Sequence, residues 1–179
     1  MLPANEWWGI LEAYGAAVWP AQILFFFSGL VLSILLLLSR KPISSLLMKL
    51  YLALSFGWIS LVFFLTIGRG LAGSFFFSAL FMVIAILFAL DSFRQRMSFG
   101  LPTVAWQKYL TLGLILIVFC YPVLGIVLGR SLEGMIVPGT FPCPTTALAL
   151  VLMTTSLPRV NRILYILLLF WAIPFAPFI

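Results

Sequence analysis

The residues best suited to chemistry form one short stretch, Pro142-Cys143-Pro144-Thr145-Thr146. Proline has no backbone N–H, so nearby carbonyl oxygens are left free to face water, a cation or another helix. A helix that begins here also presents unpaired N–H groups and the positive end of its dipole, which Thr145 and Thr146 could cap. We therefore treat all five residues as candidates for a solute-binding or pore site; the competing interpretation is a plain helix start.

The chain has two cysteines, Cys120 and Cys143. Thiolates prefer soft metal ions, so Cys143 between its prolines is a candidate metal ligand, and Cys120 could join it if the two helices pack together. The same thiols could instead form a disulfide, and a reversible one would indicate a membrane-embedded thiol redox protein. The simplest alternative is that both are small buried residues.

Gln22 is a further polar candidate, because it follows Trp19-Pro20-Ala21 at the edge of a long apolar run. Its amide could bond to a solute or to a neighbouring helix, and the second role is the more usual one. A charged set, expected on the outer side of a membrane, consists of Glu12, Arg69, Arg130 and Glu133. Intramembrane charges often mark functional paths, but these four lie at the ends of apolar runs, where they can simply anchor the chain.

Other kinds of chemistry lack the residues that they need. Histidine is absent and only four residues are acidic, whereas acid–base, nucleophilic and zinc sites depend on these side chains. The sequence has no phosphate-binding glycine loop and no dinucleotide fingerprint. We therefore expect no enzyme activity and no cofactor. The net charge is +6, but the basic residues are scattered in small groups without a basic face, so no nucleic-acid partner is expected.

The elements that must position these residues are long apolar helices. Of the 179 residues, 64% are apolar and 8% charged, which excludes a soluble globular domain, a disordered chain and a disulfide scaffold. A membrane crossing takes ~20 apolar residues. We expect an all-α, polytopic membrane helix bundle of about six transmembrane helices, forming a single transmembrane domain over residues 1–179. The apolar runs lie near 17–38, 46–67, 71–90, 106–128, 143–157 and 163–179.

The basic residues predict the orientation of these runs. Eight of the ten lie in or next to the first, third and fifth connections, namely Arg40, Lys41, Lys49, Arg94, Arg96, Lys108, Arg159 and Arg162. Short loops rich in Lys and Arg stay in the cytoplasm, so both termini are predicted outside. Asp91, at the inner end of the third run, is expected to form a local ion pair with Arg94.

Two segments depart from a simple crossing. Residues 4–15 are typical of an amphipathic helix lying along the outer surface, with Trp7, Leu11 and Tyr14 on one face. The run 143–157 spans only ~22 Å as a helix, less than the hydrocarbon thickness. It could begin as extended chain, form a re-entrant segment, or be shielded by neighbouring helices.

A repeat of about 60 residues relates the three inner connections. The matching residues are Pro42, Lys49 and Tyr51, then Pro102, Lys108 and Tyr109, then Pro158, Arg162 and Tyr165. This spacing favours three tandem helix hairpins, which could surround a central path. The alternative is that proline at helix starts and basic and aromatic residues at interfaces recur for general reasons.

The combination of Trp19-Pro20-Ala21-Gln22 with Pro142-Cys143-Pro144-Thr145-Thr146 resembles a family of small bacterial multi-pass membrane proteins of unknown function. The resemblance implies a bacterial inner-membrane location and brings no activity. From the residues themselves we favour a channel or transporter for a small solute or ion, since discontinuous helices form the binding sites of transporters. The alternative is an accessory or assembly subunit of a larger membrane complex. The expected partners are the lipid bilayer and either further copies of the chain or other membrane subunits.

Overall fold

The structure is a computed structural model that describes residues 4–39, 41–71, 73–127, 129 and 135–175. Throughout this part the secondary structure is helical, which confirms the predicted all-α class. The elements are α1 (Ala4–Leu38), α2 (Pro42–Trp58), the π-helix η1 (Ile59–Phe64), the 3-10 helix η2 (Ile67–Gly70), α3 (Ser74–Arg94), α4 (Ala105–Val127), α5 (Pro142–Thr154) and α6 (Arg162–Phe175).

Four helical stretches are long and apolar enough to cross a membrane. They are Gly9–Leu38, Pro42–Phe64, Ser74–Arg94 and Ala105–Val127. The apolar helices Pro142–Thr154 and Arg162–Ile173 are shorter, and the 13 residues of α5 rise only ~20 Å. The count of six crossings therefore stays a prediction.

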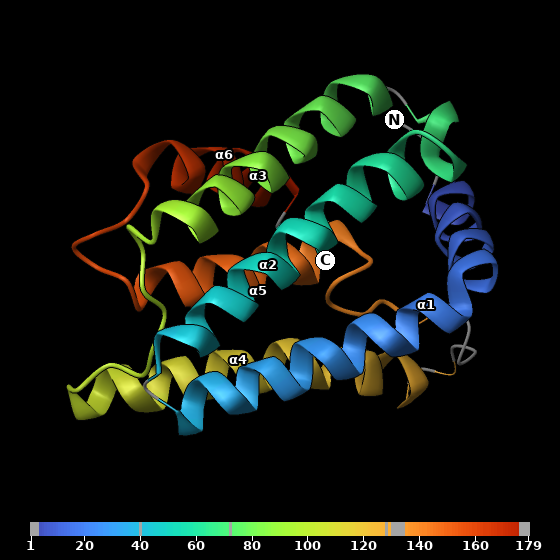
Figure 1. Cartoon of the computed structure of the whole chain (residues 1–179). Coiled ribbons are helices and arrows are strands. Elements are labelled where there is room, and N and C mark those ends of the chain that lie inside the picture. Colours follow the sequence, from blue (N-terminus) through green and yellow to red (C-terminus); the bar gives the residue numbers. More distant parts are fainter. Residues whose placement is uncertain (1–3, 40, 72, 128, 130–134, 176–179) are drawn as a thin grey trace.

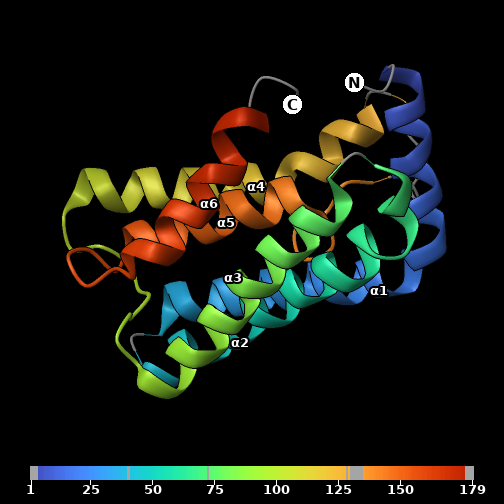
Figure 2. The same ribbon diagram turned by 90° about the horizontal axis from the view of Figure 1, so that it is seen from above.

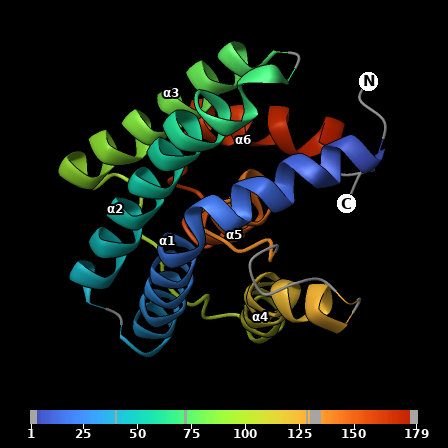
Figure 3. The same cartoon turned by 90° about the vertical axis from the view of Figure 1, so that its right-hand side faces the viewer.

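The shortest of the six α-helices, α5, lies at the centre of the bundle. It contacts α2, α4 and α6, and the end view in Figure 3 shows it surrounded by longer helices. Eight of its 13 residues are buried, against five of 23 in α4 at the periphery. Shielding by neighbouring helices, one of the alternatives for this run, is what the structure shows, and it explains how a short helix rich in threonine is accommodated.

The three connections that carry most of the basic residues lie at one end of the bundle. Figures 1 and 2 show the α1–α2, α3–α4 and α5–α6 connections together at the left, whereas the turn from η1 to α3 lies toward the other end. A single basic end is the arrangement that the loop charges predict.

The most extensive helix packing joins α2 and its continuation η1 to α3. Gly57 faces Ala85, so the two backbones approach closely. One turn further on, Ser60 Oγ lies 2.8 Å from the Ser78 carbonyl oxygen, and Ser78 Oγ lies 3.1 Å from the Ser60 carbonyl oxygen. In contrast, α3 and α4 share no extensive contact within the described residues. The middle one of the three expected hairpins is therefore not a packed unit.

The expected surface helix 4–15 is instead the first part of α1. Leu11 and Tyr14 are buried against the rest of the protein, so this segment is docked on the bundle. The helix continues through Pro20 and changes direction along its length (Figures 1 and 3). Proline removes one helical hydrogen bond and crowds the preceding turn, which accounts for the bend.

Candidate functional site

The backbone just before α5 is non-helical and buried. Every residue from Val137 to Phe141 is buried, and Thr140 is 0% exposed. Irregular backbone is tolerated at membrane depth only where protein or enclosed water covers it. The chain 137–141, which we call the buried break, and the first turns of α5 thus place the Pro142–Thr146 stretch inside the protein.

Two tyrosines bind the backbone of the buried break. The Tyr14 hydroxyl on α1 donates to the Thr140 carbonyl oxygen at 2.9 Å. The Tyr51 hydroxyl on α2 lies 3.1 Å from the Phe25 carbonyl oxygen and 3.4 Å from that of Pro138. The prolines were expected to leave nearby carbonyl oxygens free for water or a cation. In this conformation the carbonyl oxygens of Pro138 and Thr140 are instead paired with tyrosine hydroxyls.

Thr145 links α5 back to the buried break. Its hydroxyl accepts from the Gly139 N–H at 2.8 Å and donates to the Phe141 carbonyl oxygen. It therefore organises the chain before the helix and does not cap the helix N–H groups directly. Gly139 has φ +100°, a conformation that favours glycine.

Three buried polar side chains near this segment have no hydrogen-bond partner among the described residues: Gln22, Thr140 and Thr146. Gln22 is 1% exposed, and both atoms of its amide are unpaired. Such groups are usually satisfied by an enclosed water molecule or a ligand.

The position of Gln22 follows from helix geometry. Tyr14, Val18, Gln22 and Phe25 are all buried and follow one another at spacings of four, four and three residues, so they share one face of α1. Tyr14 bonds to Thr140, and Phe25 lies against Gly139. Gln22 therefore lies between two points at which α1 touches the buried break.

The remaining predicted site residues are not brought together. Both cysteines are free thiols: Cys120 is exposed, and Cys143 is half-buried beside the Trp171 side chain. The described residues contain no group of three metal-ligating acids or cysteines. Glu12 is exposed, and Arg69 lies 5.9 Å from the centre of the Phe75 ring. Arg130 and Glu133 lie outside the described residues.

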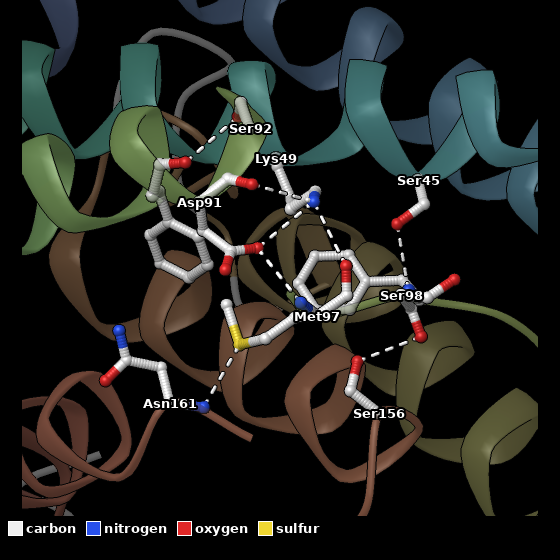
Figure 4. Close-up of polar contacts among 10 residues, drawn as sticks. Ser45, Lys49, Asp91, Ser92, Met97, Ser98, Ser156 and Asn161 are labelled. Carbon is white, nitrogen blue, oxygen red and sulfur yellow. Dashed lines mark hydrogen bonds and ion pairs between the residues drawn. The ribbon is translucent and has the colours of Figure 1, made fainter. Parts of the chain in front are cut away.

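A buried ion pair lies at the basic end of the bundle (Figure 4). Lys49 Nζ is 3.1 Å from Asp91 Oδ2, with the two side chains 2% and 4% exposed. The ammonium also donates to the carbonyl oxygens of Asp91 and Met97, at 3.2 and 3.0 Å. All three of its protons thus have an acceptor. Asp91 pairs across to α2, and the expected ion pair with Arg94 on its own helix is not what the structure shows.

Two further hydrogen bonds fix the chain that follows α3. The Phe99 N–H donates to Ser45 Oγ at 2.9 Å, and Ser156 Oγ donates to the Ser98 carbonyl oxygen at 3.0 Å. Figure 4 shows these contacts on both sides of the connection between α3 and α4. Sequence reasoning placed Lys49 among the topology signals. Lys49 lies inside an apolar run, and a charged residue at such a position usually has a buried partner, so this was the signal in the sequence that could have revealed the pair.

These features define an all-helical protein with four helices suited to a membrane and a buried break at its centre. A family model for a family of unknown function, DUF6064, matches residues 4–175, so the chain belongs to that family. This agrees with the resemblance to a family without assigned activity; the bacterial inner-membrane location stays a prediction. No curated protein and no solved structure shows a significant match to the chain.

Removing one hydroxyl tests how firmly the buried break is held. We expect Tyr14→Phe to lower the free energy of unfolding in detergent by about 1–3 kcal/mol, because the Thr140 carbonyl oxygen loses its buried donor. The indole N–H of Trp58, 2.9 Å from the same hydroxyl, loses its acceptor as well. Tyr109→Phe, at an exposed position on α4, is the matched control and should change the stability by less than about 0.5 kcal/mol.

Proposed function

We propose that the protein lets a small polar solute cross a membrane, and that the path runs past Gln22 and the buried break. The single observation that carries this proposal is the interruption of regular backbone inside an apolar helix bundle, next to buried polar groups without partners. Discontinuous helices with such interruptions form the substrate sites of many transporters.

The chemistry of the site favours an uncharged solute. The groups nearest the buried break are an amide, hydroxyls and backbone carbonyls, and the ion pair Lys49–Asp91 lies instead at the basic end, on α2 and α3. A neutral solute can exchange its water for these groups without the desolvation cost of an ion.

The conformation described is a closed one under this proposal. Tyr14 and Tyr51 hold the buried break against α1 and α2, and passage requires these hydrogen bonds to exchange for bonds to the solute. The proposal includes six crossings, with the basic end in the cytoplasm of a bacterial cell and both termini outside. The supporting feature is the shared end of the three basic connections (Figures 1 and 2).

The test is solute permeability in liposomes that contain the purified chain. Stopped-flow light scattering with urea and glycerol should show faster solute entry than in empty liposomes. Gln22→Leu and Thr146→Val should lower that rate by about tenfold, equivalent to ~1.4 kcal/mol in the barrier. Thr66→Val, at an exposed turn, is the control for the threonine change and should keep the full rate. Permeability no higher than that of empty liposomes for every solute contradicts the proposal.

One observation favours the second candidate, an accessory or assembly subunit. Helix α4 stands at the periphery with few buried residues and exposes large apolar side chains such as Leu116 and Val127. Isolation in mild detergent distinguishes the two functions. Co-purification with fixed membrane partners, combined with inactive liposomes, would support the subunit.

A further inference from the structure

A groove of about 760 Å³ separates α4 from α5. One wall of the groove is the first half of α4, and the other wall is the second half of α5. The connection between α3 and α4, around Pro102, lines one end. The volume lies in the range of pockets that hold a small organic ligand.

The lining of the groove becomes more apolar toward the middle of the bundle, although Leu101, Pro102 and Leu157 also line the basic end and Thr111 lines the middle. Near the basic end, where the α3–α4 and α5–α6 connections meet, it is lined by Thr103, Gln107, Thr154 and Thr155. Toward the middle of the bundle it is lined by Leu110, Leu114, Leu150 and Val151. From Gln107 to Leu114 the helix rises ~10 Å. This distribution suits a ligand with a polar group at the basic end and an apolar chain toward the middle.

Two basic residues and one tryptophan lie in the sequence next to or among the residues that line the basic end of the groove. Lys108 follows the lining residue Gln107, and Arg159 lies two residues after the lining residue Leu157; both are exposed. Trp106 lines the groove and is 64% exposed, as expected of an aromatic residue at the headgroup level of a membrane. Long basic side chains reach outward from such positions toward the interface.

We propose that the groove between α4 and α5 binds an anionic phospholipid of the leaflet at the basic end of the bundle. One acyl chain lies between α4 and α5, and the phosphate lies at Lys108 and Arg159. This inference depends on the location of the protein in a membrane and not on the solute that it passes.

Trp106 provides the test. The full chain is reconstituted in phosphatidylcholine vesicles that contain a small fraction of lipid with a brominated acyl chain, either phosphatidylglycerol or phosphatidylcholine, because bromine quenches tryptophan fluorescence on contact. The signal of Trp106 is obtained by difference from Trp106→Phe. We expect half of the Trp106 signal to be quenched at a fraction of brominated phosphatidylglycerol at least fivefold lower than the fraction of brominated phosphatidylcholine needed. A fivefold preference is what the attraction of one basic residue to anionic lipid would give.

Two variants separate the charges from the groove. Lys108→Gln with Arg159→Gln should remove the preference between the two lipids. Val151→Phe should fill the groove and reduce quenching by both, whereas Leu116→Phe, on the opposite face of α4, should leave it unchanged. Equal quenching by both lipids in the unmodified chain, or a preference that survives loss of both charges, would overturn the proposal.

Discussion

Replacement of Lys49 by methionine is expected to lower the free energy of unfolding by about 3–5 kcal/mol. The Asp91 carboxylate would remain buried without the ammonium group 3.1 Å away, retaining only the Met97 N–H at 3.3 Å. The carbonyl oxygens of Asp91 and Met97 would lose a donor too. Denaturant titration in mixed micelles, followed by circular dichroism, measures the change.

A double variant tells whether the loss comes from the unpaired charge. Lys49→Met combined with Asp91→Leu should recover most of the stability, because two apolar residues leave no charge uncompensated. Lys41→Met, which removes an exposed lysine at the same end, is the matched control. Equal stability of Lys49→Met and Lys41→Met would show that the ion pair does not hold α2 to α3.

The second large effect is expected at Gly139. An added Cβ would lie 2.6 Å from the Tyr51 hydroxyl oxygen and 2.9 Å from Phe25 Cβ, and φ +100° already disfavours any side chain. We expect Gly139→Ala to lower the free energy of unfolding by about 2–5 kcal/mol, combining backbone strain and overpacking. It should also separate Tyr51 from the buried break and alter solute permeability.

Gly113→Ala is the matched control for this substitution. Gly113 lies within α4, and a Cβ there meets nothing within 4 Å. Because alanine favours a helix more than glycine, this variant should be as stable as the unmodified chain or slightly more so. If Gly139→Ala is as stable as Gly113→Ala, then α1, α2 and the buried break do not approach one another as closely as the structure shows.

Much of the architecture could be predicted because it depends on composition and on local patterns. Apolar run lengths give the helices, and the loop charges give the shared basic end. The central place of α5 could not be predicted in the same way. A short run with several threonines has the same sequence whether it is a weak crossing or a helix shielded by protein, and only the surrounding helices decide.

The residues that hold the site together were predicted in part. Proline spacing identified Pro142–Thr146 as unusual, and that stretch does follow a buried break. The partner of the buried break on α1 could not be found from local patterns, since Tyr14 and Thr140 are 126 residues apart. The ion pair at the basic end could not be found either, since Lys49 and Asp91 are 42 residues apart. Tyr14 and Tyr51 resemble ordinary interfacial tyrosines in sequence, and no local signal shows that their hydroxyls bind the buried break.

A polar solute that crosses the membrane past the buried break must reach Thr140, so the chemical reactivity of a cysteine at this position decides whether the path exists. Thr140→Cys is made in a chain with Cys120→Ser and Cys143→Ser and placed in liposomes. Although Thr140 is 0% exposed in the structure, a small uncharged methanethiosulfonate that carries a hydroxyl group should modify the cysteine during transient opening and stop urea entry. If the thiol stays unmodified while a cysteine at Thr66 reacts fully, water does not reach the buried break and no solute path runs past it.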